Sequence, residues 1–316
     1  MTDRKLVLAV AQMGGVNRSD SRALVVRRLV ALLKEGKAKG ASFVVFPELA
    51  FTTFFPRYWF DDESQLNEYF ETAMPNDEVL PLFACARELG VGFYIGYAEL
   101  TPQRQRFNSS ILVDEAGKII GKYRKIHLPG HTEHKPNAQA QHLEKKYFEV
   151  GDEGFRVWDA LGTRIGMCIC NDRRWPEAYR VMALQSAELV VLGYNTPSSM
   201  AGWLTQPHQT MFHHLLSLQA GAYQNSVWVA AAAKSGSEDG HHMIGGSAIV
   251  APSGELVAQA ATEDDEVIAA TIDLNLGENY RQQVFNFAEH RRPEHYGLLI
   301  ERVGRGEPLP VSDGVG

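Results

Sequence analysis

The chain has 316 residues, of which 45% are hydrophobic and 22% are charged, and its formal net charge at pH 7 is -7. This composition excludes a wholly disordered chain and allows a large core in one big α/β domain or two smaller ones. The excess of acidic residues gives no indication of a nucleic-acid partner or of binding to an anionic membrane.

The compartment follows from what the sequence lacks. The first residues do not have the layout of a signal peptide, and no later apolar run approaches the length of a membrane span. Three cysteines, Cys85, Cys168 and Cys170, form no disulfide framework, and a bridge between the last two would be strained. We therefore expect a cytoplasmic protein.

The first elements alternate between strand and helix patterns. Residues 6–11 form an apolar run typical of a strand, residues 21–39 place apolar side chains at helical spacing, and residues 42–46 form a second strand. This βαβ beginning predicts a parallel or mixed sheet with helices packed on it. Glu48 follows the second strand, just beyond its carboxyl end. Taken alone, Glu48 is better explained as a solvated acid after a strand.

A helix and an antiparallel hairpin follow. Residues 80–89 are predicted as a helix and residues 91–98 as a strand, and residues 107–113 pair with residues 118–123 through the turn DEAGK. Lys125 comes where the hairpin is ending, so its amine could reach across the sheet edge toward other strand ends. Lysines on strand edges are otherwise ordinary solvated groups that blunt aggregation.

Two stretches in the middle of the chain point to a site. Residues 131–146 are polar, lack an apolar period and predict a loop that carries His142 and Glu144. Residues 163–169 predict a strand that runs into a polar elbow at Cys170 and then into a helix. An elbow of this kind places one side chain at the carboxyl edge of a sheet, beside a helix N-terminus that favours a thiolate. A cysteine taken alone is more often a buried, apolar-like side chain.

The remaining pattern completes a single domain. The expected elements are strands over 188–192, 226–233, 245–251, 255–260 and 267–272 and a helix over 210–223. Asn195 and Thr196 follow the first of these strands, where their side chains suit ligand contacts, although turn chemistry alone also selects Asn. With no repeat and no linker, one domain over residues 1–316 is the simplest organisation.

The tail from about residue 275 mixes aromatic residues and arginines, as in RQQVFNFAEHRRPEHYG. We expect an arm that packs on a partner subunit. Sequence alone leaves open the alternative that this tail folds back on its own domain.

The residues after three strands can act together. A thiol with a reference pKa of about 8.5 needs a base or a nearby cation to act as a nucleophile at neutral pH. Glu48 offers the base and Lys125 offers the cation to Cys170. Attack on an amide-like carbon produces an oxyanion, which the ammonium and the backbone N–H after the cysteine could stabilise. The glutamate could pass the thiol proton to the departing nitrogen and later activate water. This combination predicts a hydrolase.

The motifs around these residues resemble the nitrilase superfamily of carbon–nitrogen hydrolases, with FPE at Glu48, YRKIHL at Lys125 and CNDRRWPE at Cys170. The resemblance implies a four-layer αββα sandwich, a small-molecule substrate, no metal or other cofactor, and a homodimer or homotetramer. It also implies a second active-site glutamate, which is Glu144 by the sequence HLEKKYFEVG.

A narrower resemblance concerns the substrate. The double arginine in CNDRRWPE, together with GYNTP, LPGH and FHHLLSLQAGAYQN, is similar to N-carbamoyl-D-amino acid amidohydrolases. The resemblance implies that Arg174 and Arg173 bind the substrate carboxylate. It implies further substrate-site residues, which are His142, Asn195, Thr196, Asn171 through its backbone N–H, and His127 in support. From the residues alone, the arginines could instead form salt bridges with Asp172 and Glu177. Part of this alternative is compatible with substrate binding, because the two acids could orient the elbow while one guanidinium remains free.

The leading hypothesis is therefore hydrolysis of an N-carbamoyl-D-amino acid to the D-amino acid, carbon dioxide and ammonia through a covalent intermediate on Cys170. Another amidase, nitrilase or β-ureido acid hydrolase of the same superfamily is the alternative. A metal-dependent hydrolase is disfavoured because the eleven histidines form no HExxH pattern and no CxxC is present. A non-catalytic scaffold is disfavoured because all three reactive residues are present.

Overall fold

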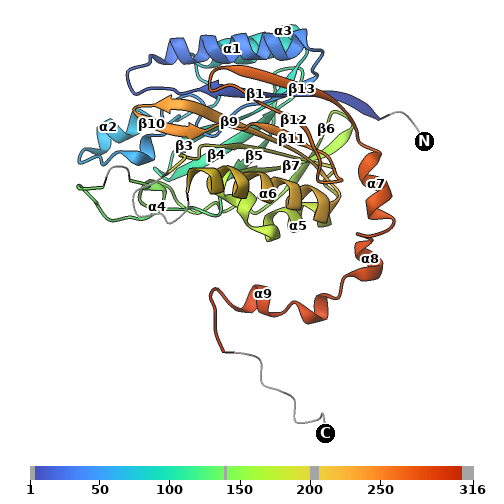
Figure 1. Cartoon of the computed structure of the whole chain (residues 1–316). Coiled ribbons are helices and arrows are strands. Elements are labelled where there is room, and N and C mark those ends of the chain that lie inside the picture. Colours follow the sequence, from blue (N-terminus) through green and yellow to red (C-terminus); the bar gives the residue numbers. More distant parts are fainter. Residues whose placement is uncertain (1–3, 139–140, 200–205, 308–316) are drawn as a thin grey trace.

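The computed structural model describes residues 4–138, 141–199 and 206–307. These residues form thirteen strands arranged as two stacked sheets, with helices on both outer faces (Figure 1). The order of layers is helix, sheet, sheet, helix, so the predicted αββα sandwich is confirmed.

The two sheets are mixed, as the βαβ beginning predicted. The first has the strand order β5 (Ile119–Arg124), β4 (Arg106–Val113), β3 (Gly92–Leu100), β2 (Phe43–Val45), β1 (Lys5–Gly14) and β13 (Glu266–Asp273). The second has the order β6 (Val157–Ala160), β7 (Thr163–Ile169), β8 (Leu189–Tyr194), β9 (Trp228–Glu238), β11 (Ala248–Val250) and β12 (Leu256–Gln259). Strand β10 (His241–Ile244) pairs with β9, and a short contact between β1 and β9 joins the sheets. Sequence patterns missed β6 and β10, which are four residues each.

Helices cover both sheets. On one outer face lie α1 (Arg22–Ala38) and α3 (Leu80–Leu89), and on the other lie α5 (Pro176–Leu184) and α6 (Pro207–Asn225). The shorter helical segments are η1 (Phe55–Arg57), α2 (Glu63–Asn67), α4 (Glu144–Tyr147), η2 (Cys170–Arg174), α7 (Leu276–Arg281), α8 (Phe287–His290), η3 (Pro293–His295) and α9 (Leu298–Glu301). Glu144 therefore begins a short helix at the end of the stretch that was predicted as a loop.

Strand periodicity decides which layer each side chain joins. Along β1, Leu8 and Val10 point into the core between the two sheets, whereas Ala9 and Ala11 point toward α1. The small alanines leave room for the larger apolar side chains of the helix. Both faces of the strand are consequently buried, as is usual for a sheet covered by helices.

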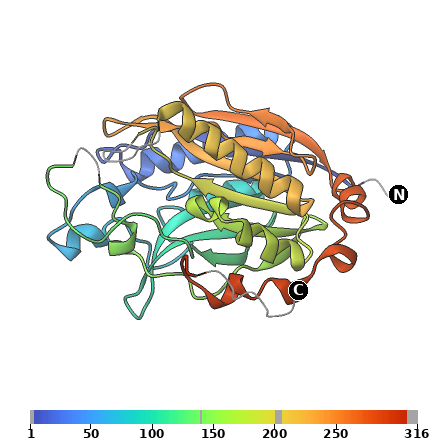
Figure 2. The ribbon, with the colours of Figure 1, turned by 60° about the horizontal axis from the view of Figure 1, so that its bottom comes forward.

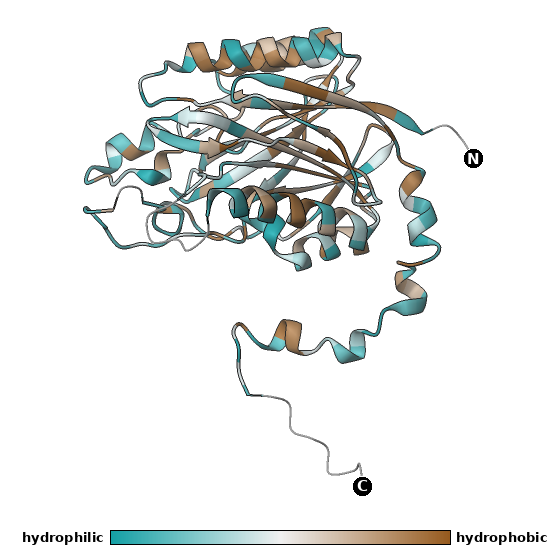
Figure 3. Ribbon diagram, in the orientation of Figure 1, coloured by the Kyte–Doolittle hydropathy of each residue, from teal (hydrophilic) through white to brown (hydrophobic). Residues whose placement is uncertain are grey.

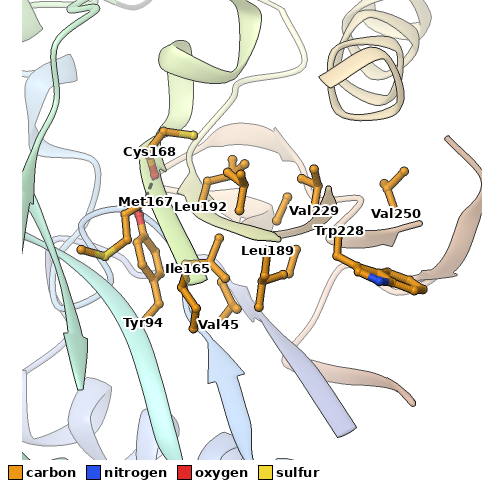
Figure 4. Packing of buried hydrophobic residues seen from close by; sticks show 14 of the residues in the cluster. Val45, Tyr94, Ile165, Met167, Cys168, Leu189, Leu192, Trp228, Val229 and Val250 are labelled. Carbon is orange, nitrogen blue, oxygen red and sulfur yellow. Dashed lines mark hydrogen bonds between the residues drawn. The ribbon is translucent and has the colours of Figure 1, made fainter. Parts of the chain in front are cut away.

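A tyrosine connects the two sheets next to the elbow. Tyr94 on β3 is fully buried, and its hydroxyl donates a hydrogen bond of 3.0 Å to the carbonyl of Cys168 on β7 (Figure 4). The same hydroxyl accepts a hydrogen bond of 3.1 Å from the backbone N–H of Gly193 on β8. These bonds fix the ends of β7 and β8 against the first sheet.

A buried ionic cluster anchors the aromatic segment that follows Glu48. Glu238 on β9 accepts hydrogen bonds from the backbone N–H of Phe54 at 2.8 Å and from Arg57 Nη2 at 2.6 Å. Lys234 Nζ lies 3.0 Å from the other oxygen of Glu238. The Phe54 ring in turn packs edge-on against the His142 ring, with 5.4 Å between centroids. The aromatic segment thus forms part of the wall next to the loop that carries Glu144.

The carboxyl-terminal segment from α7 to α9 runs along the outside of the sandwich on the side of α5 (Figures 1 and 2). Its helix α9 is strongly hydrophobic (Figure 3), yet Leu299 is 64% exposed and Ile300 is 90% exposed. The last part of the predicted arm, residues 308–316, lies outside the described residues. Within the described ranges, no helix is long and apolar enough to cross a membrane.

We predict that Gly193→Ala destabilises the protein and abolishes activity. A Cβ at this position of β8 would collide with the backbone of Pro47 and Glu48, which cannot move without disturbing the strand end. Overpacking of this kind costs about 1–3 kcal/mol of unfolding free energy, measured by urea denaturation. Gly304→Ala is the matched control because no atom lies within 4 Å of the Cβ it would add. Equal stability of the two variants would contradict the prediction.

Candidate active site

Four acidic, basic and thiol side chains meet at the carboxyl ends of the strands. Glu48 follows β2, Lys125 follows β5, and Cys170 follows β7. Lys125 Nζ donates hydrogen bonds to Glu48 Oε1 at 2.7 Å and to Glu144 Oε2 at 2.5 Å. The lysine and both glutamates are fully buried, and Cys170 is 5% exposed. The structure thus brings together the residues that the sequence placed far apart.

Asn195 connects the cysteine to the glutamate. The Cys170 thiol donates a hydrogen bond of 3.7 Å to the Asn195 carbonyl, and the Asn195 backbone N–H donates one of 2.9 Å to Glu48 Oε2. The Asn195 side-chain N–H also donates to the Glu48 carbonyl at 2.8 Å. Because Asn195 follows β8 and Glu48 follows β2, these bonds hold the ends of the two sheets together at the site.

Cys170 occupies a strained backbone position. Its φ angle is 48°, in the left-handed region that residues other than glycine rarely adopt, and it begins the 3-10 segment η2. Strain of this kind persists only where the surroundings hold it, and it is common at functional sites. The turn presents the thiol at the edge of the sheet instead of continuing the alternation of β7.

The thiol is not activated in advance. Burial and the nearby Glu48 raise the pKa of Cys170 more than Lys125 and Arg173 lower it. The expectation that a helix N-terminus would favour the thiolate is not met, because α5 begins only at Pro176. The thiol is therefore protonated at neutral pH and needs a base to become a nucleophile.

The lysine and the second glutamate form an ion pair. Burial lowers the pKa of Lys125, but Cys170 and the two glutamates outweigh burial and raise it. Burial raises the pKa of Glu144, but Lys125 and His142 lower it on balance. His142 Nε2 lies 2.8 Å from Glu144 Oε1, so the second oxygen of this carboxylate is also bound. An ammonium between two carboxylates retains one further N–H for a developing negative charge.

Asp172 joins the elbow to the segment that carries the lysine. Its carboxylate, fully buried, accepts hydrogen bonds from the Ile169 backbone N–H at 3.0 Å and from the Tyr123 hydroxyl at 2.8 Å. It also accepts from the His127 backbone N–H at 2.9 Å, and His127 Nδ1 lies 2.8 Å away. Tyr123 and His127 stand two residues before and after Lys125. One carboxylate therefore fixes the cysteine turn relative to the lysine.

Arg173 is committed to internal contacts. It is 1% exposed, and its donors bind the Cys170 carbonyl at 2.6 Å, Thr196 Oγ1 at 3.0 Å and His214 Nδ1 at 3.2 Å. The guanidinium also lies over the Tyr194 ring, 4.5 Å from its centroid. Arg173 is thus a support for the elbow, since all three of its nitrogen atoms already donate to protein acceptors.

Arg174 is different. Its side chain is exposed, and in the part of the chain that the structure describes it makes no hydrogen bond and no ion pair. Crowding by surrounding protein and the repulsion of Arg173 lower its pKa to about 10, so it stays cationic at neutral pH. The alternative of salt bridges to Asp172 and Glu177 is not what the structure shows, because Asp172 binds Tyr123 and His127 instead.

The other predicted substrate contacts are partly engaged by the protein. Thr196 binds Arg173, and the Asn171 side chain donates to the His127 carbonyl at 3.1 Å. The His127 ring stacks on Trp175, with 4.9 Å between centroids. Among the predicted site residues, Asn195 keeps a buried side-chain oxygen with no partner in the described chain.

Sequence reasoning missed Asn108, and it missed the bonds by which Asp172 joins the elbow to the lysine segment. Asn108 Nδ2 donates to Glu48 Oε1 at 2.8 Å and lies 3.4 Å from Glu144 Oε2. A signal was present, because the hairpin turn sets a register in which Asn108 lies opposite Lys125. An amide that faces the predicted lysine across the hairpin marks a polar site.

The histidines do not gather. His214 is buried against Arg173 and Tyr194, whereas its neighbour His213 is exposed. In residues 4–138, 141–199 and 206–307, no group of three or more His, Cys, Asp or Glu side chains could hold a metal ion.

Comparisons with known proteins agree with this geometry. The family described as carbon-nitrogen hydrolase matches residues 7–282. An N-carbamoylputrescine amidase of Arabidopsis thaliana is 32% identical over 297 residues, which cover 90% of this chain and 93% of the relative. A citrullinase of Francisella tularensis is 28% identical, over 90% of this chain and 95% of that protein. A crystal structure of a carbon-nitrogen hydrolase from Helicobacter pylori has the same fold, with a TM-score of 0.81 at 24% identity, and the match covers 94% of this chain and 99% of that one.

We predict that Asp172→Asn lowers turnover by roughly 10- to 100-fold while the protein stays folded, because hydrogen bonds to a buried charge contribute about 1.5–3 kcal/mol. The variant should also change the rate at which iodoacetamide alkylates Cys170, since the cysteine turn loses its link to the lysine segment. Asp159→Asn is the control, because that carboxylate is 91% exposed. Turnover and alkylation at the wild-type rates in both variants would show that Asp172 has no such role.

Proposed function

This chain belongs to the carbon-nitrogen hydrolase family, and we propose that it hydrolyses N-carbamoyl-D-amino acids to the D-amino acid, carbon dioxide and ammonia. The observation that carries the proposal is Arg174, an exposed arginine that has no hydrogen-bond or ion-pair partner among the described residues and is close enough to Cys170 to interact with its charge. A guanidinium binds a carboxylate through two parallel hydrogen bonds, so a substrate with an acid group is favoured.

In the proposed reaction, Glu48 takes the thiol proton and the Cys170 sulfur attacks the carbamoyl carbon. The raised pKa of the thiol makes this proton transfer necessary at neutral pH. The oxygen of the tetrahedral intermediate becomes negative, and the remaining Lys125 N–H and the backbone N–H of Asn171 stabilise it. Each such donor contributes on the order of 3 kcal/mol to the transition state.

The second half of the reaction restores the enzyme. The carbon–nitrogen bond breaks as Glu48 returns its proton to the departing nitrogen, which leaves an acyl group on the Cys170 sulfur. Glu48 then removes a proton from water, water attacks the same carbon, and the carbon–sulfur bond breaks to give back the thiol. The carbamic acid that carries the carbon decomposes to carbon dioxide and an amine or ammonia. Glu144 keeps Lys125 in place throughout.

The charge of Arg174 distinguishes the candidate substrates. The relative named N-carbamoylputrescine amidase acts on a carbamoyl compound, whose other end is an amine. Such a cation would be repelled by Arg174, whereas an amino acid carboxylate would be attracted. Another amidase, nitrilase or β-ureido acid hydrolase activity is the alternative within the family.

We predict that wild-type protein releases D-amino acid from a racemic N-carbamoyl amino acid and that Arg174→Gln loses most of this activity through a higher KM. Chiral chromatography gives the handedness of the product, and intact-mass spectrometry during turnover detects the adduct on Cys170. Cys170→Ala should show neither product nor adduct. Faster turnover of N-carbamoylputrescine, an amide or a nitrile, or no effect of Arg174→Gln on KM, would contradict the proposed substrate.

We also propose that the enzyme forms a homodimer or homotetramer in the cytoplasm, with the arm from about residue 275 packed on a second copy. Apolar side chains stand exposed on α6, where Phe212 is 60% exposed, and on α9, where Ile300 is 90% exposed. Contiguous exposed apolar surface is typical of interaction sites. The free cysteines Cys85, Cys168 and Cys170 fit a reducing compartment.

The expected solution mass is that of two or four chains, measured by light scattering after gel filtration. Leu299→Asp combined with Ile300→Asp should lower this mass, because charges would be buried in the contact. Glu294→Gln, an exposed polar position of the same arm, is the control. A monomeric wild type, or an unchanged mass in the double variant, would argue against the arm contact.

A further inference from the structure

We infer that Asn108, on β4, is a positioning residue that holds the two active-site glutamates around Lys125. The inference rests on the proposed function, in which Glu48 is the proton acceptor. Asn108 is fully buried, and its Nδ2 lies 2.8 Å from Glu48 Oε1 and 3.4 Å from Glu144 Oε2. The amide carries two N–H groups, so both carboxylates can receive a donor from it.

The amide binds the same two oxygens as the lysine. Lys125 Nζ donates to Glu48 Oε1 and to Glu144 Oε2, and these are the oxygens that Asn108 Nδ2 faces. The backbone reinforces the arrangement, because the Lys125 N–H donates to the Asn108 carbonyl at 2.8 Å. The Asn108 carbonyl therefore holds the Lys125 backbone, and the Asn108 side chain holds the two carboxylates that bind the lysine ammonium.

The charge balance explains why a neutral donor is needed. Glu48, Glu144 and Lys125 are fully buried, so two carboxylates share one ammonium in a site that excludes water. A second cation would compete with Lys125 for the glutamates, and a third carboxylate would repel both of them. An amide supplies donors without adding charge. The lysine then keeps an N–H for the oxyanion, and Glu48 stays oriented toward Asn195 and Cys170.

The same side chain contains evidence against a packing role. Asn108 Oδ1 is buried and has no hydrogen-bond partner in the described chain. An unpartnered buried acceptor is unfavourable, so a residue needed only to fill space would be apolar. The unfavourable burial of the amide oxygen is therefore offset by the hydrogen bonds that the amide N–H groups donate to the glutamates.

The test compares Asn108→Leu, which removes the donors, with Asn108→Asp, which has nearly the same shape. In Asn108→Leu, kcat should fall roughly 10- to 100-fold with little change in KM, because Arg174 still binds the substrate. In Asn108→Asp, kcat at neutral pH should fall further, since the introduced carboxylate faces Glu48 and Glu144. Its activity relative to Asn108→Leu should recover as the pH falls, because a protonated carboxyl group again offers a donor.

The control is Ser110→Ala, two residues along β4 on the same face, where no hydrogen bond of the described chain reaches Glu48 or Glu144. It should keep the wild-type kcat. The rate of Cys170 alkylation by iodoacetamide is measured against pH in every variant, and it requires no substrate. If the leucine variant does not fold, the nearly isosteric aspartate variant still gives the pH comparison.

Two results would overturn the inference. One is a wild-type kcat and alkylation profile in both Asn108 variants. The other is an equal loss in both variants with no recovery of the aspartate variant at lower pH, which is the pattern of a purely structural residue. Failure of the proposed function is recognised separately, because wild-type protein would then act on an amide or nitrile instead of a carbamoyl amino acid, and the same variants are compared on that substrate.

Discussion

One ammonium group shared by two buried carboxylates is the interaction on which this site depends. Lys125 is the partner of both Glu48 and Glu144, and all three are fully buried. Removing charges from water is costly, and the mutual attraction offsets that cost only where the geometry is good and the remaining oxygens are bound. His142 and Asn195 bind those oxygens, and Asn108 adds a donor to the oxygens that Lys125 contacts. The polar network is therefore a condition for the buried charges, and catalysis uses the charges that it holds.

A third carboxylate, that of Asp172, has a different task. It contacts no cation of the catalytic set but receives donors from both sides of Lys125 and from the residue before Cys170. The left-handed backbone at Cys170 needs such external support. The nucleophile and the lysine belong to different sheets, and Asp172 is the side chain that binds backbone N–H groups close to both of them.

The two adjacent arginines have the same side chain but different surroundings, and therefore different roles. Arg173 points into the protein, where the Cys170 carbonyl, Thr196 and His214 use its donors. Arg174 is exposed at the next position of the same turn. The sequence suggested that both arginines bind the substrate carboxylate. In the structure, Arg173 supports the elbow and Arg174 is an accessible cation.

The sequence by itself determined the main strands and helices and the reactive set, and the four-layer arrangement came from the family resemblance. Apolar alternation identified the main strands, helical spacing identified α1, α3, α5 and α6, and the position of Glu48, Lys125 and Cys170 after strands brought them to one edge. Strands β6 and β10 escaped because their residues, VWDA and HHMI, form neither an apolar run nor an alternation of apolar and polar side chains. Only the tertiary structure decided that the thiol has a raised pKa, that Arg173 is bound inside the protein, that Asn108 belongs to the site, and that Asp172 links the elbow to the lysine segment. Those properties depend on burial and on partners from other strands, which no local pattern encodes.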